Sequence, residues 1–176
     1  MTTTTAPAPK RVTGTDGKHR LVMERVFKAT PEEVWELWTT RDGIEAWWGP
    51  EGFITRVKTM DLRVGGEMVY DMIAQTEEIK AFMKNAGMPT TTTTRIRFME
   101  VKAPNRLVYD TWTDFIPDHA PYWVSTQVDI VTSGKSTRMT LTIDAMHVEE
   151  WTERAAAGWA SELGRLEKVL ASRGKA

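Results

Sequence analysis

The longest regular pattern of hydrophobic positions lies at the end of the chain, in residues 148–172. At 100° per residue, one side of a helix there carries eight apolar residues: Val148, Trp151, Ala155, Trp159, Leu163, Leu166, Val169 and Leu170. Charged and small polar residues fill the opposite side, and Gly174 follows as a stop. At about 1.5 Å per residue this helix would be about 37 Å long, so it must lie along a sheet or another long helix. Trp151 and Trp159 either fill a thick core or form the wall of a cavity.

The first part of the chain predicts one strand followed by two short helices. Residues 20–29 are rich in β-branched and aromatic side chains and alternate in part, as a strand does. Thr30, Pro31 and Glu33 then form a helix start with a capping box. A second short helix is expected over residues 42–48, before Gly49 and a proline.

From residue 53 the hydrophobic period changes to two. Strands are expected at residues 54–62, 67–73, 90–101, 106–115, 123–132 and 137–145. In the last two strands apolar and polar residues alternate, which indicates an antiparallel sheet with one covered face. Together with the first strand, the pattern predicts an α+β fold in which a seven-stranded curved antiparallel sheet wraps around the long C-terminal helix. One domain over residues 18–176 would follow a disordered tail, residues 1–17.

An insertion at residues 76–89 predicts a short amphipathic helix between two of these strands. Ile79, Phe82 and Met83 share one of its faces and are too apolar for a free loop. We therefore expect them to cover one mouth of a pocket as a lid, or to face a second subunit. Both a monomer and a homodimer remain open.

Composition narrows the classes of partner. The 176 residues carry 23 Lys and Arg against 24 Asp and Glu, a formal charge of −1, so nothing points to a nucleic acid or an anionic membrane. The chain has no cysteine and no apolar run long enough to span a bilayer, and its start lacks a signal-peptide pattern. A cytoplasmic location is the expectation. The 8 Trp and 10 Met suit an adaptable apolar interior.

Motifs for catalysis are lacking, and no cofactor is expected. His119 and His147 do not have the spacing of a helical metal site, so no metal is predicted either. Asp110 and Asp114 flank Trp112 on one strand, where solvent-facing carboxylates are favoured over an acid–base pair.

Arg25 lies in the first strand at the same parity as Met23 and Phe27. If that parity faces inward, the guanidinium group needs a carboxylate, and it is either half of a structural ion pair or a clamp for a ligand. The structural pair is the favoured interpretation.

A series of local motifs resembles one known family. It comprises Arg25 and Phe27 before TPEEVW at 30–35, WWGP at 47–50, DLR at 61–63 before Gly65-Gly66, PNRL at 104–107, and Gly158-Trp159 with Leu163 and Leu166. These motifs resemble the START-like or SRPBCC superfamily with the helix-grip fold. Within it, they resemble the family named after the C-terminal domain of the activator of the heat-shock chaperone ATPase. The resemblance covers residues 21–170 and carries no catalytic motif.

The resemblance implies a cavity between the long helix and the concave sheet face, in which relatives bind sterols, lipids, hormones or polyketides. The predicted function is therefore binding of a small apolar or aromatic molecule. We expect eight residues to contact it: Tyr70, Met72, Met139, Leu141, Trp151, Ala155, Trp159 and Glu162. Two alternatives remain: a regulator of a heat-shock chaperone ATPase, with that chaperone as partner, and an enzyme of the cyclase or dehydratase kind. An enzyme would need an ionisable cavity group with a displaced pKa.

Glu162 is the charged residue that falls inside the apolar stripe of the final helix. With Trp151 at 0°, it lies at about 20°, while the stripe extends to about 120° at Leu163. Its carboxylate has three options: it reaches past the edge into water, it pairs with Arg25 or Tyr70, or it faces the cavity with a pKa raised by desolvation.

Overall fold

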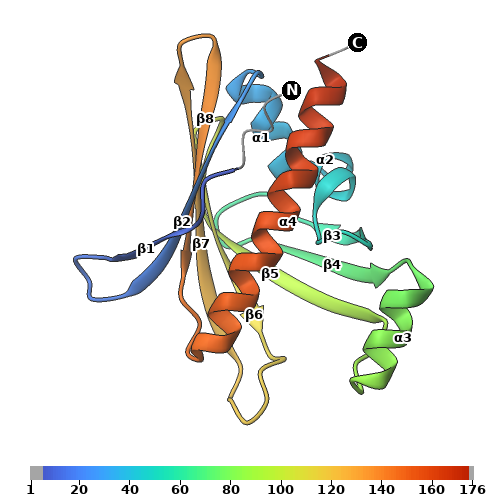
Figure 1. Ribbon diagram of the computed structural model, residues 1–176. Coiled ribbons are helices and arrows are strands. Elements are labelled where there is room, and N and C mark those ends of the chain that lie inside the picture. The colour runs from blue at the N-terminus through green and yellow to red at the C-terminus, as the bar shows by residue number, and fades with distance from the viewer. Residues whose placement is uncertain (1–5, 175–176) are drawn as a thin grey trace.

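An antiparallel sheet curves around one long helix in the computed structural model, which describes residues 6–174 (Figure 1). The strands are β1 Lys10–Thr13, β2 His19–Phe27, β3 Phe53–Met60, β4 Glu67–Ala74, β5 Thr91–Lys102, β6 Arg106–Thr113, β7 Tyr122–Ser133 and β8 Ser136–Asp144. The helices are α1 Pro31–Thr39, α2 Arg41–Trp47, α3 Glu77–Asn85 and α4 Glu149–Arg173. No helix within residues 6–174 is long and apolar enough to cross a membrane.

The strand order is β1-β2-β8-β7-β6-β5-β4-β3, and all neighbours are antiparallel. The α+β class, the curved antiparallel sheet and the C-terminal helix are as predicted. The predicted number of seven strands is wrong, because the sheet has eight. The additional strand, β1, pairs with β2 from Lys10↔Val22 to Thr13↔His19.

The additional strand lies in the segment expected to be a disordered tail. Its sequence, KRVT, is exposed throughout, so it shows no alternation of apolar and polar residues. Backbone hydrogen bonds to β2 hold it, together with a tight turn in which Gly17 has φ 79°. A pattern based on side-chain hydropathy therefore misses this strand. Residues 1–5 of the expected tail lie outside the described part of the chain.

The predicted start of α1 is confirmed. The Thr30 hydroxyl accepts a hydrogen bond from the Glu33 backbone N–H at 3.2 Å, and the Glu33 carboxylate accepts one from the Thr30 N–H at 2.6 Å. This reciprocal pair satisfies two N–H groups that the first helical turn leaves free. This pair of hydrogen bonds fixes where α1 starts after β2, and therefore how Trp38 of α1 enters the core.

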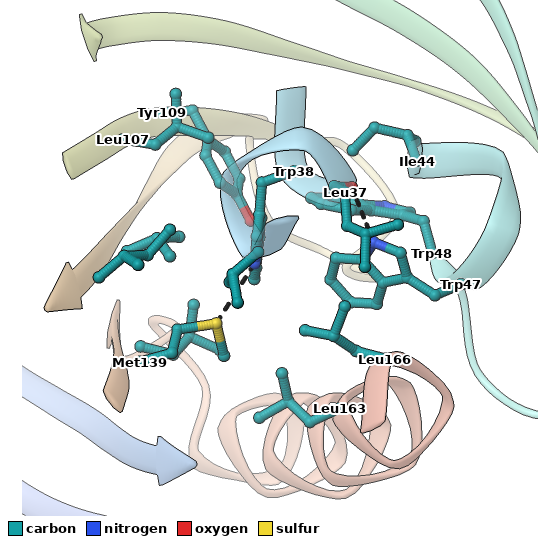
Figure 2. Packing of buried hydrophobic residues seen from close by; sticks show 14 of the residues in the cluster. Leu37, Trp38, Ile44, Trp47, Trp48, Leu107, Tyr109, Met139, Leu163 and Leu166 are labelled. Carbon is teal, nitrogen blue, oxygen red and sulfur yellow. Dashed lines mark hydrogen bonds between the residues drawn. The ribbon is translucent and has the colours of Figure 1, made fainter. Parts of the chain in front are cut away.

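A cluster of tryptophans from α1 and α2 fills the core. Trp38 and Trp47 are fully buried, with ring centroids 4.8 Å apart. The Trp38 indole N–H donates to the sulfur of Met139 at 3.3 Å, and the Trp47 N–H donates to the Leu37 carbonyl at 2.9 Å (Figure 2). The C-terminal half of α4 packs on this cluster through Leu163 and other leucines (Figure 2). Each buried polar N–H of the cluster thus has an acceptor, as close packing requires.

Helix α3 lies at the far ends of β4 and β5, away from the middle of α4 (Figure 1). Thr76 caps it by accepting from the Ile79 N–H at 3.2 Å. Met83 is buried, whereas Phe82 is 69% exposed. A Cβ placed on Gly52 would lie 2.1 Å from the Ile79 side chain, so α3 sits tightly against the segment before β3.

Candidate functional site: a cavity between α4 and the sheet

A cavity of about 150 Å³ separates the N-terminal half of α4 from the concave face of the sheet. Helix α4 contributes Thr152, Ala155, Trp159 and Glu162 to its wall. The opposite wall comes from strands β2, β4, β6, β7 and β8. The cavity begins where the solid tryptophan core ends, so α4 covers a packed core with one half and a hollow with the other.

Two tryptophans form the aromatic wall of the cavity. Trp48, directly after α2, and Trp159 of α4 meet edge to face with ring centroids 5.8 Å apart. Trp159 also stacks on Trp38 at 6.1 Å, and the Thr55 hydroxyl donates to the Trp48 carbonyl at 2.7 Å. These contacts hold both rings in place without a ligand, which keeps the wall preorganised.

Three threonines give the sheet side of the cavity a polar strip. Thr111 and Thr113 alternate with Trp112 on β6 and therefore face the concave side, and Thr126 lies on the neighbouring strand β7. Apolar side chains of Val124 and neighbouring strands surround them. The cavity is thus mixed in character, with hydroxyl groups along one wall and indole rings on another.

Glu162 faces this cavity, and its side chain is buried. Burial raises its pKa from 4.5 to about 8, while a hydrogen bond from the Gly49 backbone and the charge of Arg165 act in the opposite direction. None of the ion pairs formed among residues 6–174 includes Glu162. The structure therefore places it in the third of the three predicted positions, facing the cavity, where at neutral pH the carboxyl group is mostly protonated.

Tyr70 lies near Glu162 at the same end of the cavity. Burial raises its pKa to about 12, the nearby Glu162 charge adds to this, and hydrogen bonds with Trp48 and Thr94 partly offset it. Close to it, the buried Tyr109 hydroxyl has no hydrogen-bond partner among the protein atoms described. Burial also raises the pKa of Tyr109 well above its ordinary value, so both phenols are neutral.

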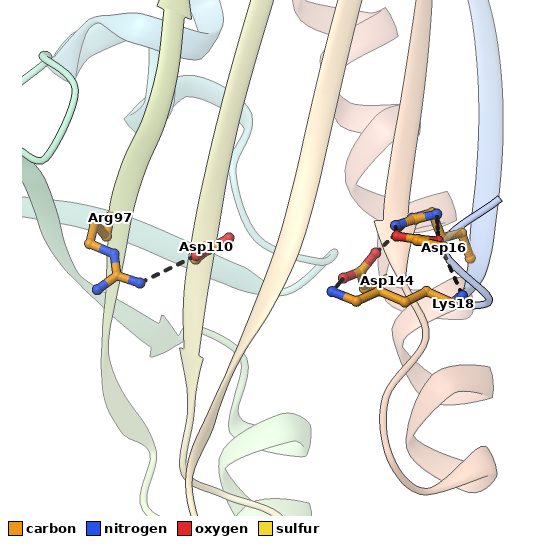
Figure 3. A network of polar contacts seen from close by, with 6 residues as sticks. Asp16, Lys18, Arg97, Asp110 and Asp144 are labelled. Atoms are coloured by element: carbon orange, nitrogen blue, oxygen red, sulfur yellow. Dashed lines mark hydrogen bonds and ion pairs between the residues drawn. The ribbon is translucent and has the colours of Figure 1, made fainter. Parts of the chain in front are cut away.

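Asp144 also contributes to the cavity wall, but its side chain has the parity of Arg20 and Thr142 on the outer face of the sheet, where it has cationic partners. Arg20 Nε lies 2.8 Å and Lys18 Nζ 3.5 Å from its oxygens, and Arg20 also pairs with Asp16 (Figure 3). This network lies at one end of the β2–β8 pair. Asp144 is thus paired with cations, which leaves Glu162 as the acid of the cavity wall that forms no ion pair among the described residues.

Four of the eight residues predicted to contact a ligand line the cavity: Tyr70, Ala155, Trp159 and Glu162. Met139 and Leu141 face inward as expected, but they are fully buried in the solid core, where the side chain of Trp38 contacts Met139. Met72 packs partly against that core. Trp151 lies beyond the cavity, against Phe115 at 5.2 Å and beneath Arg154 at 4.7 Å.

The lid expected at residues 76–89 is not over this cavity, because no residue of α3 contributes to its wall. The short helix predicted within this segment is present as α3. Ile79 packs against Gly52 in the turn before β3, Met83 is buried, and Phe82 faces outward. The element predicted to close the cavity therefore serves instead to cover the ends of two strands.

The remaining candidates lie away from the cavity. Arg25 is buried at inward parity, and its Nε is 3.5 Å from the Glu167 carboxylate, which matches the predicted structural pair. Asp110 is on the outer face, 3.4 Å from Arg97 (Figure 3). His147 stacks on Tyr122 at 3.7 Å. Within residues 6–174 no group of three or more potential ligands is arranged to hold a metal.

Sequence patterns missed several residues of the wall. Trp48 was noted only as part of a motif, and the threonines of β6 and β7 were not singled out. A signal for them exists, since Thr111 and Thr113 occupy the parity of the buried Leu107 and Tyr109. Polar residues at inward positions mark the part of the sheet that is not packed solid.

A curved antiparallel sheet, a C-terminal helix across its concave side and a cavity between them define a START-like domain. The chain belongs to the family described as Activator of Hsp90 ATPase homolog 1-like protein, whose sequence model matches residues 28–171. No curated protein matches the chain in sequence.

Solved structures share the fold at low sequence identity. The AHSA1 protein of Silicibacter pomeroyi is 21% identical with a TM-score of 0.69, covering 88% of this chain and 99% of its own. A protein from Arthrobacter aurescens is 21% identical with a TM-score of 0.70, covering 93% and 91%. The protein CV1439 of Chromobacterium violaceum is 20% identical with a TM-score of 0.68, covering 86% and 96%.

Proposed function

We propose that this protein binds a small aromatic or apolar molecule in the cavity between α4 and the sheet. The observation that supports it most directly is a hollow of about 150 Å³ with preorganised aromatic walls in an otherwise close-packed interior. A cavity of this size costs stability unless something fills it, so its presence favours a binding role. Burial of ligand surface drives binding, at about 25 cal/mol per Å² before the cost of association.

The test compares two leucine substitutions on one helix. Ala155 lines the cavity, whereas Ala157, two residues on, is exposed. Ala155→Leu is expected to fill the cavity and abolish binding of a small aromatic probe, while Ala157→Leu leaves binding unchanged. Calorimetric titration of both variants measures this directly. Equal binding by the two variants would place the ligand elsewhere and contradict the proposal.

The natural ligand is sought by mass spectrometry of an organic extract of the purified protein. A compound extracted from wild-type protein and absent from Ala155→Leu would identify it. The Ala157→Leu protein, prepared in parallel, excludes compounds that adhere to the surface.

Family membership favours a second candidate, regulation of a heat-shock chaperone ATPase. The test is the ATPase rate of the chaperone from the same organism with and without this protein. An increase that persists in Ala155→Leu would assign regulation to the surface of the domain and separate it from ligand binding.

An enzyme of the cyclase or dehydratase kind is the third candidate. It would depend on Glu162, because this carboxyl group lines the cavity and has a pKa near neutrality. Loss of turnover of the extracted ligand in Glu162→Gln, with binding retained, would support it.

A further inference from the structure

Two groups that can donate a hydrogen bond, the protonated Glu162 carboxyl group and the Tyr70 hydroxyl, lie near each other on the wall and define one end of the cavity. The buried Tyr109 hydroxyl lies close to both. We propose that this end binds the carbonyl oxygen of a single-ring ligand, which accepts hydrogen bonds from Glu162 and Tyr70. This inference rests on the proposed ligand-binding function and specifies the class of ligand.

The size of the cavity sets the size of the ligand. A dry apolar cavity of about 150 Å³ holds a molecule of the size of benzene, and the present cavity has about this volume. Trp48 and Trp159 offer indole surfaces for one ring, and Ala155 leaves room beside them. A single ring with a short substituent therefore fits, with the substituent directed at Glu162.

The direction of the hydrogen bonds follows from the protonation states. A carboxylic acid that an apolar site keeps neutral can donate its proton to a carbonyl oxygen, and a tyrosine hydroxyl can donate to the same oxygen. Tyr70 lines the cavity, and the hydrogen of its hydroxyl group can rotate toward an oxygen placed there. Two donors therefore remain for one ligand oxygen.

The charges around this end disfavour an ionic ligand. Arg165 is held by three backbone carbonyl groups, and at the other end of the cavity Asp144 is paired with Arg20 and Lys18. No Lys or Arg among residues 6–174 lines the cavity, so an anionic ligand would meet no free cation there. A cationic ligand requires Glu162 to ionise against its raised pKa. The groups that act on the pKa of Glu162 are the Gly49 backbone and Arg165 on α4. The Glu162 charge in turn raises the pKa values of Tyr70 on β4 and Tyr109 on β6, which face it from the sheet.

The test uses three ligands of nearly equal size: acetophenone with a carbonyl group, ethylbenzene with none, and 1-phenylethylamine with a positive charge. Calorimetric titration of the wild-type protein near pH 7 is expected to show acetophenone binding about tenfold more tightly than ethylbenzene, as two additional hydrogen bonds imply. Between about pH 7 and pH 9 its affinity is expected to fall about tenfold, because Glu162 loses its proton.

Variants separate hydrogen bonding from general effects of packing. Glu162→Gln keeps a donor, so it is expected to retain the preference for acetophenone while losing the pH dependence. Glu162→Leu and Tyr70→Phe remove one donor each and are expected to lower the preference about threefold to tenfold. Glu153→Gln changes an exposed acid on the same helix and is expected to keep the wild-type profile.

Three results would overturn the proposal, and each is distinct. Equal affinities for acetophenone and ethylbenzene would keep the cavity as a binding site but remove the carbonyl contact. If 1-phenylethylamine bound most tightly of the three, with an affinity that rose with pH, Glu162 would act as an ionised carboxylate that pairs with the positive charge of the ligand. Binding of none of the three would contradict the proposed function for single-ring ligands and this inference with it.

Discussion

Arg165 and Glu162 lie three residues apart on α4, close enough for an ion pair, yet Arg165 directs its guanidinium group elsewhere. Its Nη1 lies 2.7 Å from the Gly49 carbonyl oxygen, 3.2 Å from that of Pro50 and 2.9 Å from that of Phe53. Arg165 thus anchors the segment between α2 and β3 to the helix. Because this role occupies the cation, the Glu162 charge is compensated only weakly, and burial dominates its pKa.

The first prediction concerns stability against pH. The pKa of Glu162 is about 8 in the folded protein against an ordinary 4.5, so the folded state retains the proton over this range and the unfolded state does not. Stability from this group is full below about pH 4.5 and is lost as pH rises through 8, at up to about 1.4 kcal/mol per pH unit. Urea unfolding at a series of pH values from 5 to 9 measures this change in the free energy of unfolding. Glu162→Gln is expected to flatten this slope, and an unchanged slope would show that Glu162 ionises normally.

The second prediction concerns Arg165→Met. Loss of the positive charge is expected to raise the pKa of Glu162 further, since Arg165 now lowers it. Loss of three carbonyl contacts is expected to reduce the free energy of unfolding by about 2–4 kcal/mol. NMR titration of the Glu162 carboxyl carbon and urea unfolding measure the two effects.

Arg173→Met is the matched control for Arg165→Met. Arg173 lies on the same helix and pairs with Glu36 at the surface, with both side chains more than a third exposed. Its loss is expected to cost at most about 1 kcal/mol and to leave Glu162 unchanged. A similar cost for the two variants would mean that Arg165 does not anchor the α2–β3 segment.

The third prediction separates the core from the cavity. Met139→Ala is expected to destabilise the fold by about 2–5 kcal/mol, because it leaves a void and removes the acceptor of the Trp38 N–H. Affinity for a cavity ligand is expected to remain within about twofold of wild type. Met99→Ala, at an exposed methionine, provides the reference for stability. A large loss of affinity in Met139→Ala would return this residue to the binding site.

The fourth prediction concerns α3. Phe82→Ser is expected to change neither ligand affinity nor, by more than about 0.5 kcal/mol, stability, because Phe82 is 69% exposed and α3 does not touch the cavity. Met83→Ala, at the buried neighbour, is expected to destabilise by about 2–4 kcal/mol. Calorimetric titration and thermal unfolding distinguish the two. Weaker ligand binding in Phe82→Ser would restore the lid hypothesis.

Local sequence patterns were sufficient to predict every helix and strand except β1, and also the inward position of Glu162. The capping box at Thr30 and Glu33 fixed the start of α1, and the angle of Glu162 within the stripe of α4 put it on the inner side. Both depend only on nearby residues. β1 was missed because its four exposed residues are held by backbone pairing alone.

The sequence pattern did not predict what each inward-facing side chain contacts inside the fold. The alternation along β8 predicts that Met139 and Leu141 face inward. Whether these side chains meet a cavity or a tryptophan depends on where α1 places Trp38 over the sheet. The same holds for Trp151, which packs against Phe115 of the cavity wall and does not line the cavity itself. Contacts between distant segments decide these cases.

The two halves of α4 differ in how strongly they are held. Leu163, Leu166 and Leu170 are buried in the second half, whereas Thr152 is the buried residue before Glu162, and Val148 provides no side-chain cap. Local opening requires little free energy where few apolar contacts break, so backbone amides at 150–160 should exchange with deuterium much faster than those at 163–170. A single continuous helix would then contain its own hinge. Fraying of its first turns would give a ligand a path into the cavity, and a bound ligand would slow exchange in those turns alone.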